Sequence, residues 1–387
     1  MIRINILTTT RAEYGLMRPL IRRMLEDDDI QMHLVVTGTH LDEKYGLTYK
    51  EIEKDEFPIY KKIPILSEKS GALSVSETMA NALKSFTEYF LEEKPDFLLV
   101  DGDRYETMAV CMAAFNTNVP IIHCGGGATT EGAADEFYRH AITKMAYLHF
   151  PTTEIYRKRI IQLGEDPDRV FTVGSLGIEN ILTTKLLSKE ELSEMIQFPL
   201  DKPYALVTFH PVTLENQTSS EQLLELFKAC DSRLDINFIF TMVNADAGGK
   251  EINELLRDFS ASRTDRVLCV ESLGSLKYLS AMKYCEFVLG NSSSGLIETP
   301  SFKIPTVNIG DRQRGRIKAN SVIDCEPLEQ NILEAIDKAM SPEFRQICKA
   351  TVNPNGDGDT TRKIVDSIKY YCENHTVDLK KRFYDLL

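Results

Sequence analysis

The chain has little of what nucleic-acid-binding and membrane proteins need. Of its 387 residues, 45 are Lys or Arg and 58 are Asp or Glu, so the formal net charge is −13. Such a surface repels a polyanion, which excludes general nucleic-acid binding. No apolar run approaches the roughly 18 residues of a membrane span, and the first residues read as a strand rather than a signal peptide. We expect a soluble, cytoplasmic protein that binds neither nucleic acid nor membrane.

Several motifs of cofactor and metal proteins are also missing. Neither GxGxxG nor GxxxxGK[ST] occurs, so nothing indicates a dinucleotide or a P-loop. The eight cysteines are scattered without a CxxC pair, as is typical of reduced thiols in a cytoplasmic protein. No His/Cys/Asp cluster has the spacing of metal ligands. We therefore predict neither a cofactor nor a metal.

Apolar segments instead alternate with helix-like segments in two series, which predicts parallel sheets with crossover helices. The expected strands are residues 2–7, 32–37, 97–100, 120–123 and 148–151, then 204–208, 237–241, 266–270, 287–289 and 306–309. The length suits two domains, and the two halves predict two Rossmann-like α/β domains. Sheets of this kind bind ligands beyond the carboxyl ends of their strands, so two facing sheets would form one cleft.

The predicted domain boundary lies between residues 175 and 200, where a Lys/Glu-rich helix at about 188–197 leads into the second series. We predict an N-terminal domain over residues 1–180 and a C-terminal domain over 181–365. The final helix, over 366–387, is expected to pack back on the N-terminal domain.

The run from Gly290 to Glu298 is the most informative segment, because it lies between a strand-like and a helix-like segment. The first amides of a helix bind anions, and small residues allow a phosphate to approach. Asn291, Ser292 and Ser293 add polar side chains, and Glu298, about two turns into the expected helix, can accept from ribose hydroxyls. The alternative is an ordinary Ser/Gly turn.

Polar residues also follow the strands of the first half. Arg11 can bind a phosphate, or can form a surface ion pair with a nearby acid such as Glu13. His40 follows the next strand. The turn from Asp101 to Glu106 includes Asp103 and Arg104; its acids can cap a helix or be tuned for proton transfer.

A second loop in this half carries three glycines, residues 125–127, which indicate close backbone approach or a mobile loop. Glu131 and Asp135 follow them, and Asp135 can also act as a first-turn acid of a helix.

In the second half, His210 and Asn244 follow strands. Arg312, Arg314 and Arg316 form a basic group that suits an anion, a solvated patch or an oligomer contact.

Taken together, these segments resemble the hydrolysing branch of the UDP-N-acetylglucosamine 2-epimerases, which serves sialic and related nonulosonic acid synthesis. The resemblance covers nearly the whole chain. Its carriers are Thr10–Tyr14, Thr37–Leu41, Gly102–Arg104, Arg139–Lys144, His210–Thr213, Asn244–Gly248, Gly290–Ser293 and Gly310–Gln313.

The resemblance implies a GT-B-like pair of domains, a nucleotide-sugar substrate and a homodimer or homotetramer. It implies that UDP leaves C1 as the C2 proton is removed, and that water adds to the resulting glycal to give the free 2-epimeric sugar. The implied catalytic residues are Asp103, Asp135 and His210, and we add Glu131 as a hypothesis because it lies in the glycine-rich loop. The implied substrate-binding residues are Arg11, His40, Arg104, Asn244, Asn291, Ser292, Ser293, Glu298 and Arg312.

One loop departs from this family. The family usually reads His-Ile-Glu-Gly-Gly-Glu or His-Ile-His-Gly-Gly-Glu where this chain has His123-Cys-Gly-Gly-Gly-Ala128. Gly125 cannot act as an acid or base. We expect either that Glu131, or Asp103 with Asp135, supplies the missing group, or that the space accommodates a different C4 or C6 substituent.

Two other functions suit the same architecture. One is a GT-B-type glycosyltransferase, which would transfer the sugar to an acceptor; the segment from Arg139 to Lys144 favours the epimerase. The other is a nucleotide-sugar-binding homologue without catalysis, which only Gly125 and Ala128 support.

Overall fold

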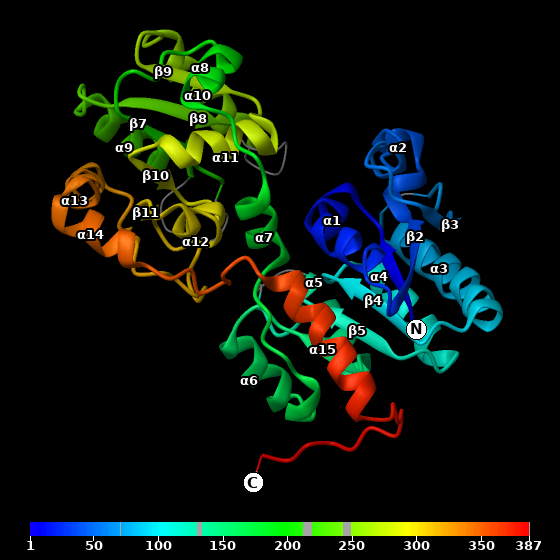
Figure 1. The fold of residues 1–387 in the computed structure, drawn as a ribbon. Coiled ribbons are helices and arrows are strands. Elements are labelled where there is room, and N and C mark those ends of the chain that lie inside the picture. The colour runs from blue at the N-terminus through cyan, green and yellow to red at the C-terminus, as the bar shows by residue number, and fades with distance from the viewer. Residues whose placement is uncertain (70, 130–133, 212–218, 243–248, 387) are drawn as a thin grey trace. The chain divides into compact units, whose positions relative to one another are not determined.

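The computed structural model describes residues 1–69, 71–129, 134–211, 219–242 and 249–386. By their contacts these residues form two compact units. Unit 1 contains Met1–Asn180 and Asn355–Leu387, and unit 2 contains Ile181–Pro354. The chain thus returns to unit 1 earlier than the predicted residue 366. Figure 1 shows the helices and strands of both units.

Unit 1 is built on a parallel sheet that has six strands in the described part of the chain, in the order β3-β2-β1-β4-β5-β6. The strands are β1 (Ile2–Thr8), β2 (Ile30–Thr37), β3 (Ile59–Ile63), β4 (Phe97–Asp101), β5 (Ile121–Cys124) and β6 (Leu148–Phe150). The α-helices of this unit are α1 (Arg11–Leu25), α2 (Tyr49–Lys54), α3 (Gly71–Glu93), α4 (Tyr105–Asn116), α5 (Ala134–Met145), α6 (Glu154–Gln162) and α15 (Thr360–Asn374), and short 3-10 helices cover Gly38–Leu41, Glu43–Tyr45 and Pro167–Arg169.

Both faces of this sheet are buried, which explains why its central strands are apolar throughout rather than alternating. On one face, Ile4 and Ile6 pack with residues of α1 and α15, including Met17 and Ile368. On the other face, residues of α3, α4 and α5 pack on strand residues such as Val100. The final helix is therefore part of the core of unit 1.

Unit 2 repeats the arrangement, with six parallel strands among its described residues in the order β12-β11-β10-β7-β8-β9. The strands are β7 (Tyr204–Thr208), β8 (Asn237–Thr241), β9 (Val267–Val270), β10 (Phe287–Gly290), β11 (Thr306–Ile309) and β12 (Val322–Cys325). The helices are α8 (Lys189–Ile196), α9 (Ser219–Asp231), α10 (Gly249–Ala261), α11 (Gly274–Tyr284), α12 (Ser294–Ile297), α13 (Glu329–Met340) and α14 (Pro342–Ala350), with a 3-10 helix at Thr299–Phe302; α7 (Leu176–Thr183) spans the boundary between the units.

These elements confirm the predicted class of two Rossmann-like α/β domains. The predicted helix near residues 188–197 is α8, whose start is fixed by a reciprocal capping box between Ser188 and Glu191. None of the helices in the described ranges is long and apolar enough to cross a membrane.

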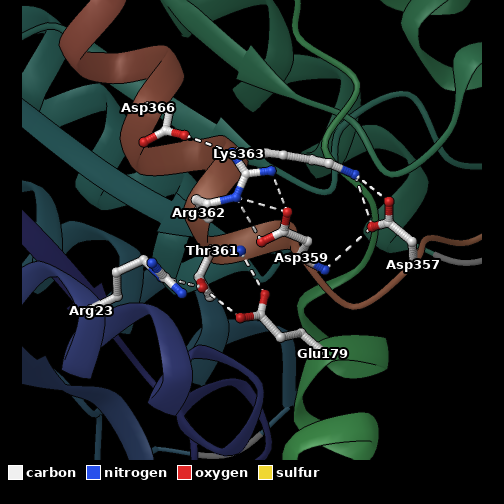
Figure 2. Close-up of polar contacts among 8 residues, drawn as sticks. All are labelled: Arg23, Glu179, Asp357, Asp359, Thr361, Arg362, Lys363 and Asp366. Carbon is white, nitrogen blue, oxygen red and sulfur yellow. Dashed lines mark hydrogen bonds and ion pairs between the residues drawn. The ribbon is translucent and has the colours of Figure 1, made fainter.

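The return of the chain into unit 1 is fixed at the start of α15, as Figure 2 shows. The Glu179 carboxylate accepts from the Thr361 backbone N–H at 2.6 Å and from its hydroxyl at 2.5 Å. Arg23 donates from Nε to the same hydroxyl at 2.8 Å. Both Glu179 and Thr361 are buried, so these bonds satisfy polar groups that would otherwise be costly to bury. Ion pairs lie around them, between Arg362 and Asp359 or Asp366 and between Lys363 and Asp357.

Candidate active site

Asp103, a candidate catalytic residue of unit 1, lies beyond the carboxyl end of a strand whose neighbours in the sheet end at the same edge. Strands β1, β4 and β5 are adjacent and parallel, so Thr8, Asp101 and Cys124 end at one edge of the sheet. This is the edge at which open α/β sheets bind ligands.

Asp103 lies just beyond β4 and is paired with an arginine from α5. Arg139 donates from Nε to Asp103 Oδ2 at 2.7 Å. Its Nη1 donates to the Ala128 carbonyl at 3.1 Å and to Glu136 at 2.9 Å. Arg139 is only 6% exposed, so a buried guanidinium joins the loop after β4 to the loop after β5.

Asp101, the last residue of β4, has a raised pKa. Desolvation, reinforced by the negative charge of Asp103, raises the pKa of Asp101 to about 7. Neither acid caps the next helix, because the N-cap position of α4 belongs to Arg104. The prediction that these acids cap a helix is therefore wrong.

His123, near the end of β5, holds this turn in place. Its Nδ1 lies 3.1 Å from the Thr143 hydroxyl and its Nε2 lies 3.0 Å from the Gly102 carbonyl. A carbonyl only accepts, so Nε2 carries the proton. Burial lowers the pKa of His123 to about 3, so the ring is neutral and acts as a fixed brace.

The three glycines after β5 are not equivalent. A Cβ at Gly126 would lie 2.8 Å from the Thr143 hydroxyl, and one at Gly127 would lie 2.5 Å from the Tyr156 carbonyl. These two positions require glycine because of close packing, which is the close approach that the sequence suggested. At Gly125 the backbone itself favours glycine, because its φ of +78° is a conformation that L side chains rarely adopt, and the nearest atom to a Cβ there is Asp101 Oδ1 at 3.6 Å. The missing side chain at Gly125 thus leaves space beside Asp101.

A third carboxyl near this edge belongs to Glu13 in the first turn of α1. Its Oε2 accepts from the Thr9 N–H at 3.1 Å and from the Thr9 hydroxyl at 2.7 Å. Its Oε1 is buried and has no hydrogen-bond partner among the described residues. Burial raises the pKa of Glu13 to about 8, against the opposing effect of the Thr9 bonds. The side chain is therefore protonated at neutral pH.

This pKa predicts a pH-dependent stability. The native Glu13 keeps its proton up to about pH 8, whereas the unfolded group ionises near its ordinary pKa of 4.5. The native state then binds more protons, so its free energy of unfolding falls as the pH rises from about 4.5 to 8. The variant Glu13→Gln, which keeps an acceptor for Thr9, should be roughly 2 to 4 kcal/mol more stable than wild type at pH 8.5 and similar to it at pH 4.5. Urea unfolding at both values measures this difference; equal gains at both would contradict the protonated state.

The other predicted residues of unit 1 have separate surroundings. Arg11 is 71% exposed and forms an ion pair with Glu51 at 3.0 Å, rather than with Glu13. Arg104 forms a bidentate ion pair with Glu106: its Nη2 donates to Oε1 at 2.8 Å and its Nε donates to Oε2 at 3.1 Å. Asp135 is exposed in the first turn of α5. Its catalytic role stays a prediction.

His40 is fully buried. Its Nε2 lies 3.0 Å from the Thr8 hydroxyl and its Nδ1 lies 2.8 Å from the Thr48 hydroxyl. Burial lowers the pKa of His40 to about 4, so the ring is neutral. Both ring nitrogens are thus engaged by threonines, and His40 supports the end of β1 in this structure.

In unit 2, Asn291 organises the loop after β10. Its Oδ1 accepts from the His210 N–H at 2.6 Å and its Nδ2 donates to the His210 carbonyl at 2.9 Å. The carbonyl of Asn291 accepts from Arg312 Nη1 at 3.1 Å and from Gln313 Nε2 at 2.8 Å. Asn291 therefore joins the loops after β7, β10 and β11, and brings together His210 and Arg312 as predicted site residues.

Glu298 lies fewer helical turns beyond Ser292 and Ser293 than the expected long helix suggested. Helix α12 covers only Ser294–Ile297, so Glu298 comes one turn after the serines rather than about two turns into a long helix. Its Oε2 accepts from the Ser294 hydroxyl at 2.6 Å, and that hydroxyl accepts from Tyr278 at 2.9 Å. Burial raises the pKa of Glu298. Ser292 and Ser293 precede α12 and are partly exposed.

The three arginines near residue 314 do not act as one group. Arg312 contacts Asn291, whereas Arg314 and Arg316 line a cavity of about 650 Å³. Acidic residues line the same cavity, namely Asp311, Asp324, Glu326 and Glu334. Lys318 and Lys338 line it as well, so the cavity carries charges of both signs, and an anion site at Arg314 and Arg316 stays a prediction.

Two predicted residues, Glu131 and Asn244, lie outside the described residues. Asp101 was expected only as one acid of its turn, and Glu13, Gln313 and Arg139 only as members of motifs, so their part in these clusters was not predicted from the sequence. Their signal was present in the sequence as polar residues at strand ends. Within the described ranges, no three His, Cys, Asp or Glu side chains gather as metal ligands.

The fold and these two residue sets define an α/β protein with two Rossmann-like domains, each of which carries polar residues at the carboxyl edge of its sheet. A family model described as UDP-N-acetylglucosamine 2-epimerase matches residues 22–369. The chain belongs to this family.

Similar proteins agree with this membership. A GDP/UDP-N,N'-diacetylbacillosamine 2-epimerase (hydrolyzing) of Campylobacter jejuni is 41% identical over 99% of both chains. A UDP-N,N'-diacetylbacillosamine 2-epimerase (hydrolyzing) of Legionella pneumophila is 34% identical over 95% of both. Among solved structures, UDP-GlcNAc 2-epimerase of Neisseria meningitidis bound to UDP-GlcNAc has a TM-score of 0.78 at 20% identity, covering 96% of this chain and 100% of that one.

Proposed function

We propose that this protein is a hydrolysing 2-epimerase that converts UDP-N,N'-diacetylbacillosamine to UDP and the free 2-epimeric sugar. The observation that carries the proposal is the 41% identity, over 99% of the chain, to the hydrolysing enzyme of Campylobacter jejuni. The carboxyls beyond β4 support the chemistry, because removal of a weakly acidic ring proton requires a positioned base.

In this proposal unit 2 binds the UDP moiety. Glu298 accepts from the ribose hydroxyls, and Asn291, Ser292, Ser293 and Arg312 hold the diphosphate. His210 acts near the glycosyl phosphate, where the growing charge of the leaving UDP needs donors. Arg11 and Arg104 serve the substrate from unit 1, together with His40, although its two ring nitrogens are engaged by threonines.

Unit 1 carries out the proton transfers. Asp103 or Asp135 removes the C2 proton as the C1–O bond to UDP breaks, which leaves a double bond between C1 and C2. Water then adds its hydroxyl to C1, and C2 receives a proton on the opposite face.

The proposal extends to the setting of the protein. All eight cysteines are unpaired thiols, which suits a reducing cytoplasm. A homodimer or homotetramer stays a prediction.

The substrate is tested by measuring UDP release from UDP-N,N'-diacetylbacillosamine and from UDP-N-acetylglucosamine under the same conditions. We expect kcat/KM to be at least about tenfold higher for the diacetamido sugar, because a pocket shaped for one substituent discriminates by this order. Equal or higher values for UDP-N-acetylglucosamine would contradict the proposed substrate. Tight binding without UDP release from either sugar would contradict the enzyme.

A further inference from the structure

Resting on the proposed function, we propose that Asp101 is the proton donor to C2, in place of the acid that this chain lacks at Gly125.

The geometry around the glycine loop supports this assignment. Of the three consecutive glycines, Gly126 and Gly127 lie close to neighbouring atoms, whereas at Gly125, whose φ is +78°, the nearest atom to a Cβ would be Asp101 Oδ1 at 3.6 Å. A longer side chain at residue 125 would compete with Asp101 for the same space. Glycine at this position leaves that space to the Asp101 carboxyl.

The two acids beyond β4 are suited to opposite roles. Asp103 pairs with the buried guanidinium of Arg139, which donates to its Oδ2 at 2.7 Å. Asp101 ends the strand two residues earlier, and both its desolvation and the charge of Asp103 favour its protonated form. Two carboxyls whose surroundings separate their protonation states provide an acid and a base at the same pH.

The groups that face Asp101 come from three elements. Asp103 follows the same strand, and Glu13 of α1 and Cys124 of β5 interact with Asp101 electrostatically. Glu13 and Cys124 are themselves neutral at pH 7, because burial raises the pKa of each. Of these three neighbours, Asp103 is therefore the one whose charge raises the pKa of Asp101.

The proton and electron balance of the step is complete. The base takes the C2 proton, and UDP leaves with the electron pair of its bond to C1. Protonated Asp101 then gives its proton to C2 of the glycal while the oxygen of water bonds to C1. One proton of that water stays in the new C1 hydroxyl, and the other passes to Asp101. The base releases its proton to solvent.

The test compares Asp101→Asn with wild type in UDP release, UDP affinity and pH dependence. Loss of a general acid should lower kcat at least about 100-fold. The UDP affinity should stay within about twofold, since Asp101 makes no contact with the nucleotide in this account. In wild type kcat should fall as the pH rises through about 7, and the variant should lose this dependence. The variant Asp101→Glu should restore part of the activity.

The matched control is Asp96→Asn, which changes the acid next to the opposite end of β4. Asp96 accepts from the Arg3 N–H at 2.8 Å, an exposed contact that asparagine can keep. Its kcat should equal that of wild type. If wild type and Asp101→Asn show equal kcat and equal pH dependence, the inference is wrong while the proposed function stands. If wild type itself releases no UDP, both are contradicted.

Discussion

Replacing Asp103 with asparagine is expected to lower kcat for UDP release by roughly 10³- to 10⁴-fold, the upper range for a general base. Asparagine has nearly the same shape and can still accept from Arg139 Nε, which donates to Asp103 at 2.7 Å. The loop after β4 should therefore stay in place, and the loss should come from the missing proton acceptor. Turnover and UDP affinity measured together separate these effects, because only kcat should change.

A matched control for this variant is Glu136→Gln. Glu136 is the second carboxylate that pairs with Arg139, at 2.9 Å, and it lies on α5. Its replacement removes the ion pair between residue 136 and the Arg139 guanidinium but leaves Asp103 in place. Since partly exposed ion pairs are worth about 1 kcal/mol or less, kcat should change less than about fivefold. Equal losses in both variants would mean that Asp103 acts only by positioning Arg139.

The variant Glu298→Ala is expected to raise the dissociation constant for UDP by roughly 10- to 100-fold. This corresponds to the loss of hydrogen bonds to a charged group, about 1.5–3 kcal/mol. The carboxylate is held by the Ser294 hydroxyl at 2.6 Å, which is itself held by Tyr278 at 2.9 Å. These two hydrogen bonds orient the Glu298 carboxylate before the ribose binds. Isothermal titration with UDP measures the change.

The control for Glu298 is Glu286→Ala, which changes an acid next to the opposite end of β10. Glu286 is partly exposed and forms an ion pair with Arg345. UDP affinity should match wild type in this variant. If Glu298→Ala also keeps wild-type affinity for UDP, Glu298 does not bind the ribose.

Most of the sheet architecture could be predicted from the sequence, because internal strands of parallel sheets are continuous apolar runs. β7, β8 and β11 match the predicted residues, and the other predicted strands are correct to within two residues. The two missed strands, β3 and β12, are both at an edge of their sheet. Their sequences, Ile59-Tyr-Lys-Lys-Ile63 and Val322-Ile-Asp-Cys325, contain charged, exposed residues and so lack the continuous apolar run of an internal strand.

The candidate site could be predicted only as a set of strand ends. Polar residues after a strand predict the edge of the sheet where they lie, which is why Asp103 and His210 are found beside other site residues. The protonation of Asp101 and Glu13 depends on burial and on neighbours from other elements, which spacing does not reveal. The length of α12 was overestimated because Pro300 and the turn at Thr299–Phe302 end the helix early.

The central claim is that this chain breaks the C2–H bond and releases UDP from a sugar nucleotide. Proton NMR of the reaction of UDP-N,N'-diacetylbacillosamine in deuterated water tests it most directly. The account predicts free UDP together with a free 2-epimeric sugar that carries deuterium at C2. A released sugar that retains its proton at C2 would contradict the elimination mechanism and the roles of Asp101 and Asp103.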